Sequence, residues 1–417
     1  MIPHVKFQTE LQVKDSMRSL VSVLSGEEYP FERLAEFADD GDPLEVRCDL
    51  SHARVRSGAS GITSRFSDFF AYQNVAQGGG LGEIVTPLVQ APQPLIDFMG
   101  IERLLLKNET MNPTWSFKDR GTLPCVWLAA ELGETTLATI STGTMGHSVA
   151  AYAARHGLRA IVFVPDFTPQ EKILSMGAHG AVVVRVAAEN FGVMTRSVLA
   201  HGEAAGLRIV SGNGPHRVEG YKLEAFEMWE QLGGEAPDYI AVPTSACGHI
   251  RGIHKGWREL FAAGLVAQVP RMIVVQAANN APLVTGIEQG LDRMVPVEHV
   301  DTIAEAITSG NPPGGDALVR QAQSLGWPAA TATEDEILDG QSRLARGGYL
   351  VEPASAVSVH AVRKLRAAGV IAPEARVVLM LTGSGLKDPT ILHRHSMKIM
   401  DVNEHDLPAV MGDLAAS

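Results

Sequence analysis

The feature that most constrains the fold is a series of short apolar runs that alternate with helical patterns. Each run is rich in valine and isoleucine and apolar at nearly every position, which is typical of strands buried on both faces of a sheet. The intervening segments have helical spacing, as at Val149, Tyr152 and Ala153. This alternation predicts an α/β fold with two doubly wound, mostly parallel sheets. The clearest runs are RAIVFVP (159–165), AVVVRV (181–186), YIAVPTS (239–245), RMIVVQA (271–277) and ARVVLML (375–381).

Composition and charge exclude several classes of protein. Apolar residues make up 45% of the 417 residues and the formal net charge is −12, so we expect a globular chain that binds neither nucleic acid nor an anionic membrane. The three cysteines form no Cys-x-x-Cys pair, and we expect no metal site and no disulfide framework. No apolar run reaches the roughly 18 residues of a membrane helix. Residues 1–16 lack the apolar core of a signal peptide, so a cytoplasmic enzyme is expected.

Ligands of doubly wound sheets bind beyond the carboxyl ends of the strands. Two predicted strand ends lead directly into a predicted helix, whose first N–H groups can bind an anion such as phosphate. An ordinary strand-to-helix turn has the same appearance, and both interpretations stay open at this point. The loops at predicted strand ends are 141–147 (STGTMGH), 211–217 (SGNGPHR), 244–249 (TSACGH) and 382–385 (TGSG).

A lysine in an aromatic-flanked turn is the strongest candidate for chemistry. Lys118 lies in NPTWSFKDRG (112–121), after a proline and at a predicted helix start. Most lysines at such places are simply exposed. An apolar neighbour such as Phe117, however, lowers the pKa of an amine and makes it a nucleophile. A lysine, an anion-binding loop and a strand-end hydroxyl, Thr382, together describe a site for pyridoxal phosphate.

The chain resembles the threonine synthase family and, more broadly, the tryptophan-synthase-β-type (fold type II) pyridoxal phosphate enzymes. The matching stretches occur in family order over nearly the whole chain, and SFKDRG with LTGSGLKDP is the most specific pair. These stretches are PLEVRCDL (43–50), NPTWSFKDRG (112–121), STGTMGHSVAAYAARHGL (141–158), GPHRVEGYK (214–222), AVPTSACGHI (241–250), PRMIVVQA (270–277), LVEPASA (350–356) and LTGSGLKDP (381–389).

The resemblance implies a set of cofactor-binding residues. Lys118 would bind the cofactor as a Schiff base and then move protons at the substrate carbons, and Phe117 would line the cofactor ring. Thr382 would hydrogen-bond the pyridine nitrogen, and Thr144 stands where the family has an asparagine next to a cofactor oxygen. The backbone N–H groups of the cofactor phosphate site would come from Ser245, Ala246, Cys247, Gly248 and His249.

The resemblance also implies substrate-binding residues. The loop that binds the substrate carboxylate would be Ser141, Thr142 and Gly143. Arg217 would meet a substrate phosphate, or alternatively form an ion pair with Glu219 or Glu224. The positions of Met145 and Gly212 are polar in the family and help to bind that phosphate.

Three functions are compatible with these residues. The first is β/γ-elimination and replacement of the threonine synthase type, in which O-phosphohomoserine and water give threonine and phosphate. The second is a diverged paralogue that uses another activated amino acid, or a deaminating dehydratase. The third is a cofactor-binding protein without catalysis, which the presence of Lys118 disfavours. Met145, Gly212 and Trp115, which replaces a family glycine, depart from the family pattern, and they predict that O-phosphohomoserine is a poor substrate.

The domain organisation is inferred from the change in composition and hydrophobic pattern along the chain. Residues 1–75 are mixed and charged, and we expect an N-terminal extension with short helices and a turn at 27–43. Residues 125–215 are predicted to form a small α/β domain, and 76–124 with 216–417 a large cofactor-binding domain. The cofactor would lie in the cleft between the two domains. Fold type II enzymes are commonly dimers, so a homodimer acting on a small amino acid is expected.

Overall fold

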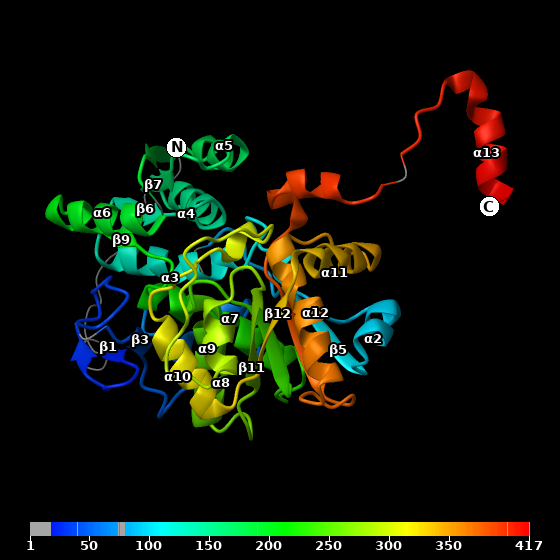
Figure 1. The fold of residues 1–417 in the computed structure, drawn as a ribbon. Helices are drawn as coiled ribbons and strands as arrows, with labels where there is room; N and C mark the ends of the chain where they lie inside the picture. Colours follow the sequence, from blue (N-terminus) through cyan, green and yellow to red (C-terminus); the bar gives the residue numbers. More distant parts are fainter. Residues whose placement is uncertain are drawn as a thin grey trace.

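The computed structural model describes residues 18–39, 41–73, 75, 80–189, 191–397 and 399–416 (Figure 1). Our prediction for the signal-peptide region, residues 1–16, lies outside these residues. Within the described ranges, no helix is long and apolar enough to cross a membrane. The fold is mixed α/β and contains two separate, mostly parallel sheets, which confirms the predicted fold class.

The larger sheet has six strands in the order β12-β11-β10-β13-β5-β4. Its strands run parallel, except that β4 is antiparallel to β5. Central strand β10 pairs with both β11 and β13, and Tyr239 lies between Arg271 and Val377. The strands are β4 (Leu88–Gln90), β5 (Arg103–Asn108), β10 (Tyr239–Pro243), β11 (Arg271–Ala277), β12 (Ala329–Ala332) and β13 (Arg376–Leu381).

Helices cover both faces of this sheet, because its strands are apolar at consecutive positions. In β13, Val377 and Leu379 face one core, and Val378 and Met380 face the other. One core is closed by α2 (Gln93–Met99), α11 (Glu334–Arg346) and α12 (Pro353–Ala367). The other is closed by α3 (Lys118–Glu131), α7 (Pro215–Gln231), α8 (Gly248–Ala262), α9 (Pro282–Glu288) and α10 (Gly315–Leu325).

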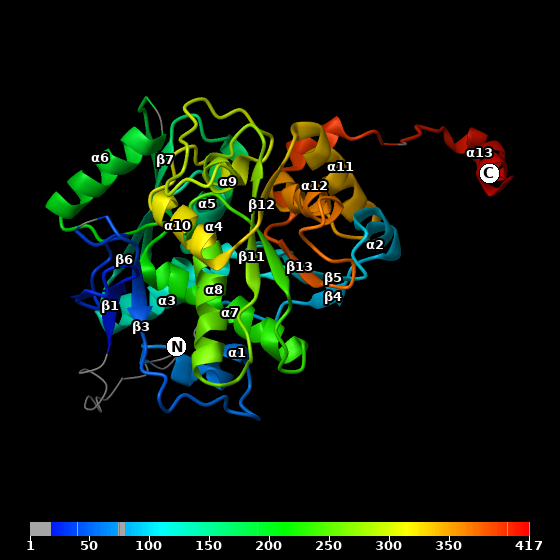
Figure 2. The same ribbon diagram turned by 60° about the horizontal axis from the view of Figure 1, so that its bottom comes forward.

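The smaller sheet has four parallel strands in the order β8-β7-β6-β9. It lies beside the larger sheet, with α4 and α5 on one face and α6 on the other (Figure 2). Its elements are β6 (Thr136–Ile140), α4 (Thr144–Arg155), β7 (Arg159–Pro165), α5 (Gln170–Ala178), β8 (Val182–Val186), α6 (Phe191–Ala204) and β9 (Ile209–Val210).

The N-terminal part differs from our expectation. Residues 27–43 contain β2 and turns, so the predicted short helices are wrong. The pairing of β1 with both β2 and β3 across the chain decides the structure there. The remaining strands and helices are β1 (Ser19–Ser22), β2 (Glu28–Tyr29), β3 (Leu44–Arg47), α1 (Ile62–Arg65) and α13 (Leu407–Ala416). The short 3-10 helices are η1 (Ser67–Phe69), η3 (Glu109–Met111), η4 (Glu305–Ile307), η5 (Gly385–Lys387), η6 (Pro389–Arg394) and η7 (Glu404–Asp406).

Candidate active site

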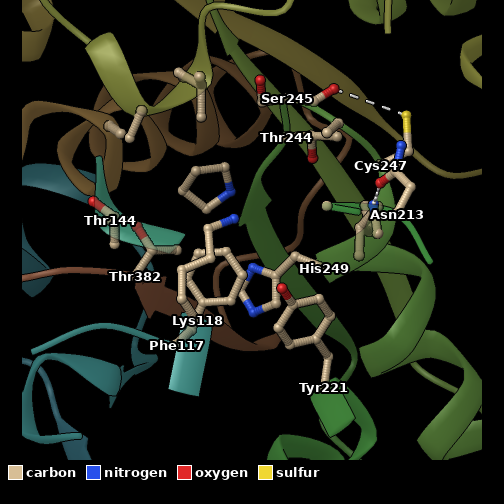
Figure 3. A pocket seen from close by; sticks show the side chains of 18 of the residues that line it. Phe117, Lys118, Thr144, Asn213, Tyr221, Thr244, Ser245, Cys247, His249 and Thr382 are labelled. Atoms are coloured by element: carbon tan, nitrogen blue, oxygen red, sulfur yellow. Dashed lines mark hydrogen bonds between the residues drawn. The ribbon is translucent and has the colours of Figure 1, made fainter. Parts of the chain in front are cut away.

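A cavity lies where strand ends of both sheets meet, and Lys118 projects into it (Figure 3). The loops after β9, β10 and β13 line it, together with Thr144 at the start of α4. Every residue that we predicted to contact the cofactor lines this one cavity: Phe117, Lys118, Thr144, Ser245, Ala246, Cys247, Gly248, His249 and Thr382. The predicted substrate residues Ser141, Thr142, Gly143, Met145 and Arg217 are not among those that line it.

The turn that carries Lys118 is held by the end of β13. The Phe117 N–H donates to the Thr382 carbonyl at 3.0 Å, and the Ser384 N–H donates to the Trp115 carbonyl at 3.0 Å. Trp115 has a φ of 65°, a left-handed conformation that favours glycine. This conformation fits the glycine that the resemblance implies at this position. The two hydrogen bonds place Lys118 at the first turn of α3, beside the strand end.

The environment of Lys118 suits an amine nucleophile. Its Nζ lies 4.2 Å from the centre of the Phe117 ring. Burial, and then the positive charge of Arg217, lower the pKa of Lys118 to about 8. Roughly a tenth of the amine is therefore neutral, and hence nucleophilic, at pH 7.

Thr382 belongs to a small buried hydrogen-bond group. Its hydroxyl donates to Glu352 Oε1 at 3.0 Å and lies 2.8 Å from Ser355 Oγ. Ser355 Oγ also accepts from the Gly383 N–H at 3.2 Å. Burial raises the pKa of Glu352, a residue that lines the cavity. Our prediction missed Glu352, although the stretch LVEPASA (350–356) was already singled out.

The loop between β10 and α8 presents unbonded N–H groups. Within the described residues, the N–H groups of Ser245, Ala246, Cys247 and His249 donate no hydrogen bond. Cys247 has a φ of 70°, which turns the backbone sharply into the helix. Unbonded N–H groups at a helix start are a ready anion site. Burial raises the pKa of the Cys247 thiol to about 12, so this cysteine is not a thiolate nucleophile.

Gly248 differs from its neighbours in that loop. Its N–H donates to Asn213 Oδ1 at 2.9 Å and to the Ala246 carbonyl at 2.9 Å. Asn213, which our prediction missed, lies in the strand-end loop 211–217 and lines the cavity. A side-chain amide therefore ties the loop after β9 to the loop after β10.

The loop after β6 uses its side chain to build the start of α4. Ser141 Oγ accepts from the Gly143 N–H at 3.0 Å and from the Gly146 N–H at 2.9 Å. Ser141 is buried and Thr142 is exposed. Met145 is buried, and a Cβ built on Gly212 would lie 3.9 Å from its Sδ. Two of the positions that depart from the family pattern are therefore neighbours, and neither offers a polar side chain.

Arg217 is fully buried and carries an unsatisfied guanidinium. Its Nε donates to the Ser211 carbonyl at 3.1 Å, and its Nη1 donates to Thr122 Oγ1 at 3.1 Å. Among the described residues, Nη2 has no partner, and no ion pair joins Arg217 to Glu219 or Glu224. The structure thus leaves a buried cation without a carboxylate partner beside Lys118.

A network of buried ion pairs supports the helix that carries Lys118. Arg120 Nη1 lies 2.5 Å from Glu227 Oε1, and Arg120 Nε lies 3.0 Å from Glu109 Oε2. Lys107 Nζ lies 2.6 Å from Glu227 Oε2. All four side chains are fully buried. The network joins α3 to α7 and to the end of β5.

In the described part of the chain, no group of three or more His, Cys, Asp or Glu side chains could hold a metal ion.

Comparison with solved structures supports the fold. A threonine deaminase from Solanum lycopersicum superposes with a TM-score of 0.65 at 22% identity, covering 87% of this chain and 94% of that one. Maize serine racemase superposes with a TM-score of 0.63 at 18% identity, covering 75% and 91%. At these identities the likeness concerns the fold alone.

Comparison of sequences shows the family. A family model described as "Pyridoxal-phosphate dependent enzyme" matches residues 80–383. "Threonine synthase" of Methanocaldococcus jannaschii is 34% identical over 357 residues, which are 85% of this chain and 87% of the relative. "Threonine synthase" of Halalkalibacterium halodurans is 34% identical over 350 residues, which are 84% and 94%. The chain belongs to the pyridoxal-phosphate dependent enzyme family, in its threonine synthase branch, and its cofactor is pyridoxal phosphate.

Proposed function

We propose that this enzyme carries pyridoxal phosphate on Lys118 and catalyses elimination and replacement at the side-chain carbons of an amino acid. The observation that carries the proposal is the meeting of Lys118 with an N–H-rich loop in one cavity. The reference reaction is that of threonine synthase, the name of the relatives above, in which O-phosphohomoserine and water give threonine and phosphate.

The side chains and backbone groups of the cavity fit the cofactor. The N–H groups of Ser245, Ala246, Cys247 and His249, unbonded within the described residues, suit a phosphate. Phe117 offers an apolar ring face. The Thr382 hydroxyl, which donates to Glu352 in this structure, would turn to donate its one proton to the ring nitrogen. A hydroxyl does not hold that nitrogen protonated, whereas a carboxylate would. When bound, the cofactor supplies an electron sink that labilises bonds at the amino-acid carbons.

The protein's own groups then position the substrate and move protons. The N–H groups of Thr142, Thr144 and Met145 donate no hydrogen bond within the described residues, so the start of α4 can bind a carboxylate. Lys118 Nζ takes and returns the proton at the substrate carbon. Its lowered pKa, to about 8, suits both directions of transfer near neutral pH.

The substrate is the part of the proposal on which two observations disagree. Within the part of the chain that the structure describes, Arg217 is a buried cation without a carboxylate partner, which favours a phosphorylated substrate. Met145 and Gly212 offer no strong side-chain donor at two positions where the resemblance implies polar residues that bind phosphate, and each lost donor is worth roughly 1.5–3 kcal/mol. We propose that the loss dominates, and that O-phosphohomoserine binds about 10²–10⁴-fold more weakly than in a typical threonine synthase.

Steady-state kinetics with a matched pair of variants test this proposal. The double variant Met145→Thr, Gly212→Ser restores polar side chains, and we expect kcat/KM for O-phosphohomoserine to rise by about 10²–10⁴. The control Gly177→Ser changes a glycine with nothing within 4 Å of its Cβ position and should leave kcat/KM unchanged. If the unmodified enzyme releases threonine at roughly 1–10³ per second, the substitutions are harmless and the substrate is O-phosphohomoserine. A spectral shift with another activated amino acid would identify the diverged substrate.

Two further properties belong to the proposal. A homodimer is expected from the resemblance to fold type II enzymes, and sedimentation velocity of the purified protein measures the state directly. A cytoplasmic location is expected from the sequence, because the three cysteines are free.

A further inference from the structure

A buried pair of side chains lies beside Lys118 and has no role in the function proposed above. His249, in the first turn of α8, lines the cavity with Lys118. Its imidazole stacks on Phe117, with ring centres 3.7 Å apart and planes at 21° (Figure 3). Behind it, Glu224 of α7 lies with its Oε2 2.8 Å from His249 Nε2. The pair therefore extends from the cavity into the interior.

The remaining nitrogen of this imidazole is available to a ligand. His249 Nδ1 is buried and has no hydrogen-bond partner among the residues that the structure describes. The stacking on Phe117 and the hydrogen bond to Glu224 fix the ring, so Nδ1 cannot turn toward bulk water. An unsatisfied buried polar group of this kind destabilises the folded protein. A polar ligand atom in the cavity would remove that cost.

The pair can take up one proton without forming a charged imidazole. In its unprotonated state, Nε2–H donates to the Glu224 carboxylate and Nδ1 carries a lone pair. When Nδ1 takes a proton, the Nε2 proton passes to Glu224 Oε2. The result is a neutral imidazole with its proton on Nδ1 and a neutral carboxyl group. Two protons have moved, the pair has gained one proton in total, and only these N–H and O–H bonds have changed.

The surroundings favour these neutral forms. Burial, and then the nearby Glu109, raise the pKa of Glu224. Burial, and then the nearby Lys118, lower the pKa of His249. Opposite charges in the adjacent ion-pair network largely balance one another, and Lys118 is the charge that lowers the pKa of His249 most. The titratable and charged groups that face the pair are Lys107, Glu109, Lys118, Arg120, Tyr221 and Glu227.

We propose that His249 is a second proton-exchanging residue of the active site, and that Glu224 is the positioning residue that stores its proton. In the protonated state, Nδ1 donates a proton to the departing group of the substrate. In the resulting unprotonated state, Nδ1 takes a proton from the attacking water as the oxygen bonds to the substrate carbon. The pair ends the cycle as it began. This inference rests on the proposed function, because it assigns residues of the same site.

Glu224→Gln in the full-length holoenzyme tests the role, because it keeps the size of the side chain and removes the proton store. We expect kcat to fall by about 10²–10⁴, with KM and the cofactor dissociation constant within about threefold of the parent. We also expect one inflection to disappear from the pH profile of kcat. His249→Asn should give the same result, and it replaces Glu224→Gln as the test if that variant fails to fold. The control Glu259→Gln removes a buried carboxylate outside the cavity and should leave the pH profile unchanged.

Infrared spectroscopy gives a readout that does not depend on turnover. We expect the carbonyl band of a protonated carboxyl group to appear as the pH falls, and to be absent in Glu224→Gln. The proposal would be overturned if both variants kept the carbonyl band and the pH profile of kcat of the parent enzyme. Absence of bound chromophore in the parent, or of activity on any amino acid, would instead refute the proposed function, and the infrared result would still decide the pair.

Discussion

At the scale of single residues, the backbone explains two unusual positions of the site. Trp115 and Cys247 both have left-handed φ values, 65° and 70°, at the turns that lead into α3 and α8. Such values cost a non-glycine residue about 1–2 kcal/mol. Both turns bring the start of a helix to the cavity, so the strained residues lie beside the proposed active site.

Paired variants at Trp115 measure that strain. Trp115→Gly and Trp115→Ala lose the same side chain and its contact with His147, at 6.0 Å between ring centres. Only glycine relieves the left-handed backbone, so we expect Trp115→Gly to be more stable than Trp115→Ala by about 1 kcal/mol. Urea unfolding of both proteins measures the difference. Equal stabilities, or a more stable alanine variant, would show that the turn is not strained.

The pKa of Lys118 gives a prediction for the cofactor-free protein. Burial and Arg217 lower this pKa to about 8, and only the neutral amine reacts with an aldehyde. The rate of cofactor attachment should therefore rise as the pH increases through about 8 and then level off. Stopped-flow absorbance after mixing with pyridoxal phosphate measures this rate. A rate that continues to rise toward pH 10 would indicate an unshifted lysine.

Residue-level prediction led to strand-end groups that the structure brings together in one cavity, and it missed groups placed there by packing. The strand-end rule led to Thr382 and to the loop at 244–249. Asn213 and Glu352 line the same cavity but are recognisable only when neighbouring loops meet. Neither of the two ion pairs considered for Arg217 forms, because Glu219 pairs with Lys222 and Lys255, and Glu224 with His249.

At the scale of elements, the turn into α8 requires a glycine for space. A Cβ on Gly248 would lie 2.9 Å from Asn213 Oδ1 and 3.2 Å from the Gly212 carbonyl. Gly248→Val should therefore displace the loop and raise the cofactor dissociation constant by about tenfold, equivalent to about 1.4 kcal/mol. Gly177→Val, a helical glycine with open space at its Cβ, is the control. Equal cofactor affinity in both variants would show that this loop does not bind the cofactor phosphate.

The buried ion pairs of α3 make a second prediction at this scale. Arg120→Met leaves Glu109 and Glu227 buried without their common partner, and should lower the free energy of unfolding by about 3–5 kcal/mol. Although burial alone would raise it, Arg120 and Lys107 lower the pKa of Glu109 to about 2. The contribution of Glu109 is therefore complete above the ordinary pKa of about 4.5, and is lost as the pH falls toward 2. Chemical unfolding at several pH values measures both effects, and a loss below 1 kcal/mol would contradict them.

Elements with continuous apolar runs were predictable, and elements built by distant pairing were not. β7, β8, β10, β11 and β13 coincide with the valine- and isoleucine-rich runs. β12 is the short segment AATA, whose small side chains give no strand signal, and it forms because β11 pairs with it. The segment 27–43 reads as helical, but β2 forms there because β1 pairs with it.

At the scale of the whole molecule, the site exists because two sheets direct strand ends toward one cavity. Thr144 follows a strand of the smaller sheet, and Thr382 follows a strand of the larger sheet. The turn that carries Lys118 is hydrogen-bonded to the backbone at the end of β13, in the larger sheet. Alternating apolar runs predicted both sheets, but not how the sheets face each other, which depends on contacts between distant side chains. In both views α13 lies apart from the rest of the chain (Figures 1 and 2).

The attachment of pyridoxal phosphate to Lys118 is the central claim, and covalent trapping tests it most directly. The holoenzyme is reduced with borohydride, digested, and mapped by mass spectrometry. Our account predicts a single phosphopyridoxyl label on Lys118, and no label in Lys118→Ala, which should still bind the cofactor without a covalent bond. A label on another lysine, or an undiminished label in Lys118→Ala, would contradict it.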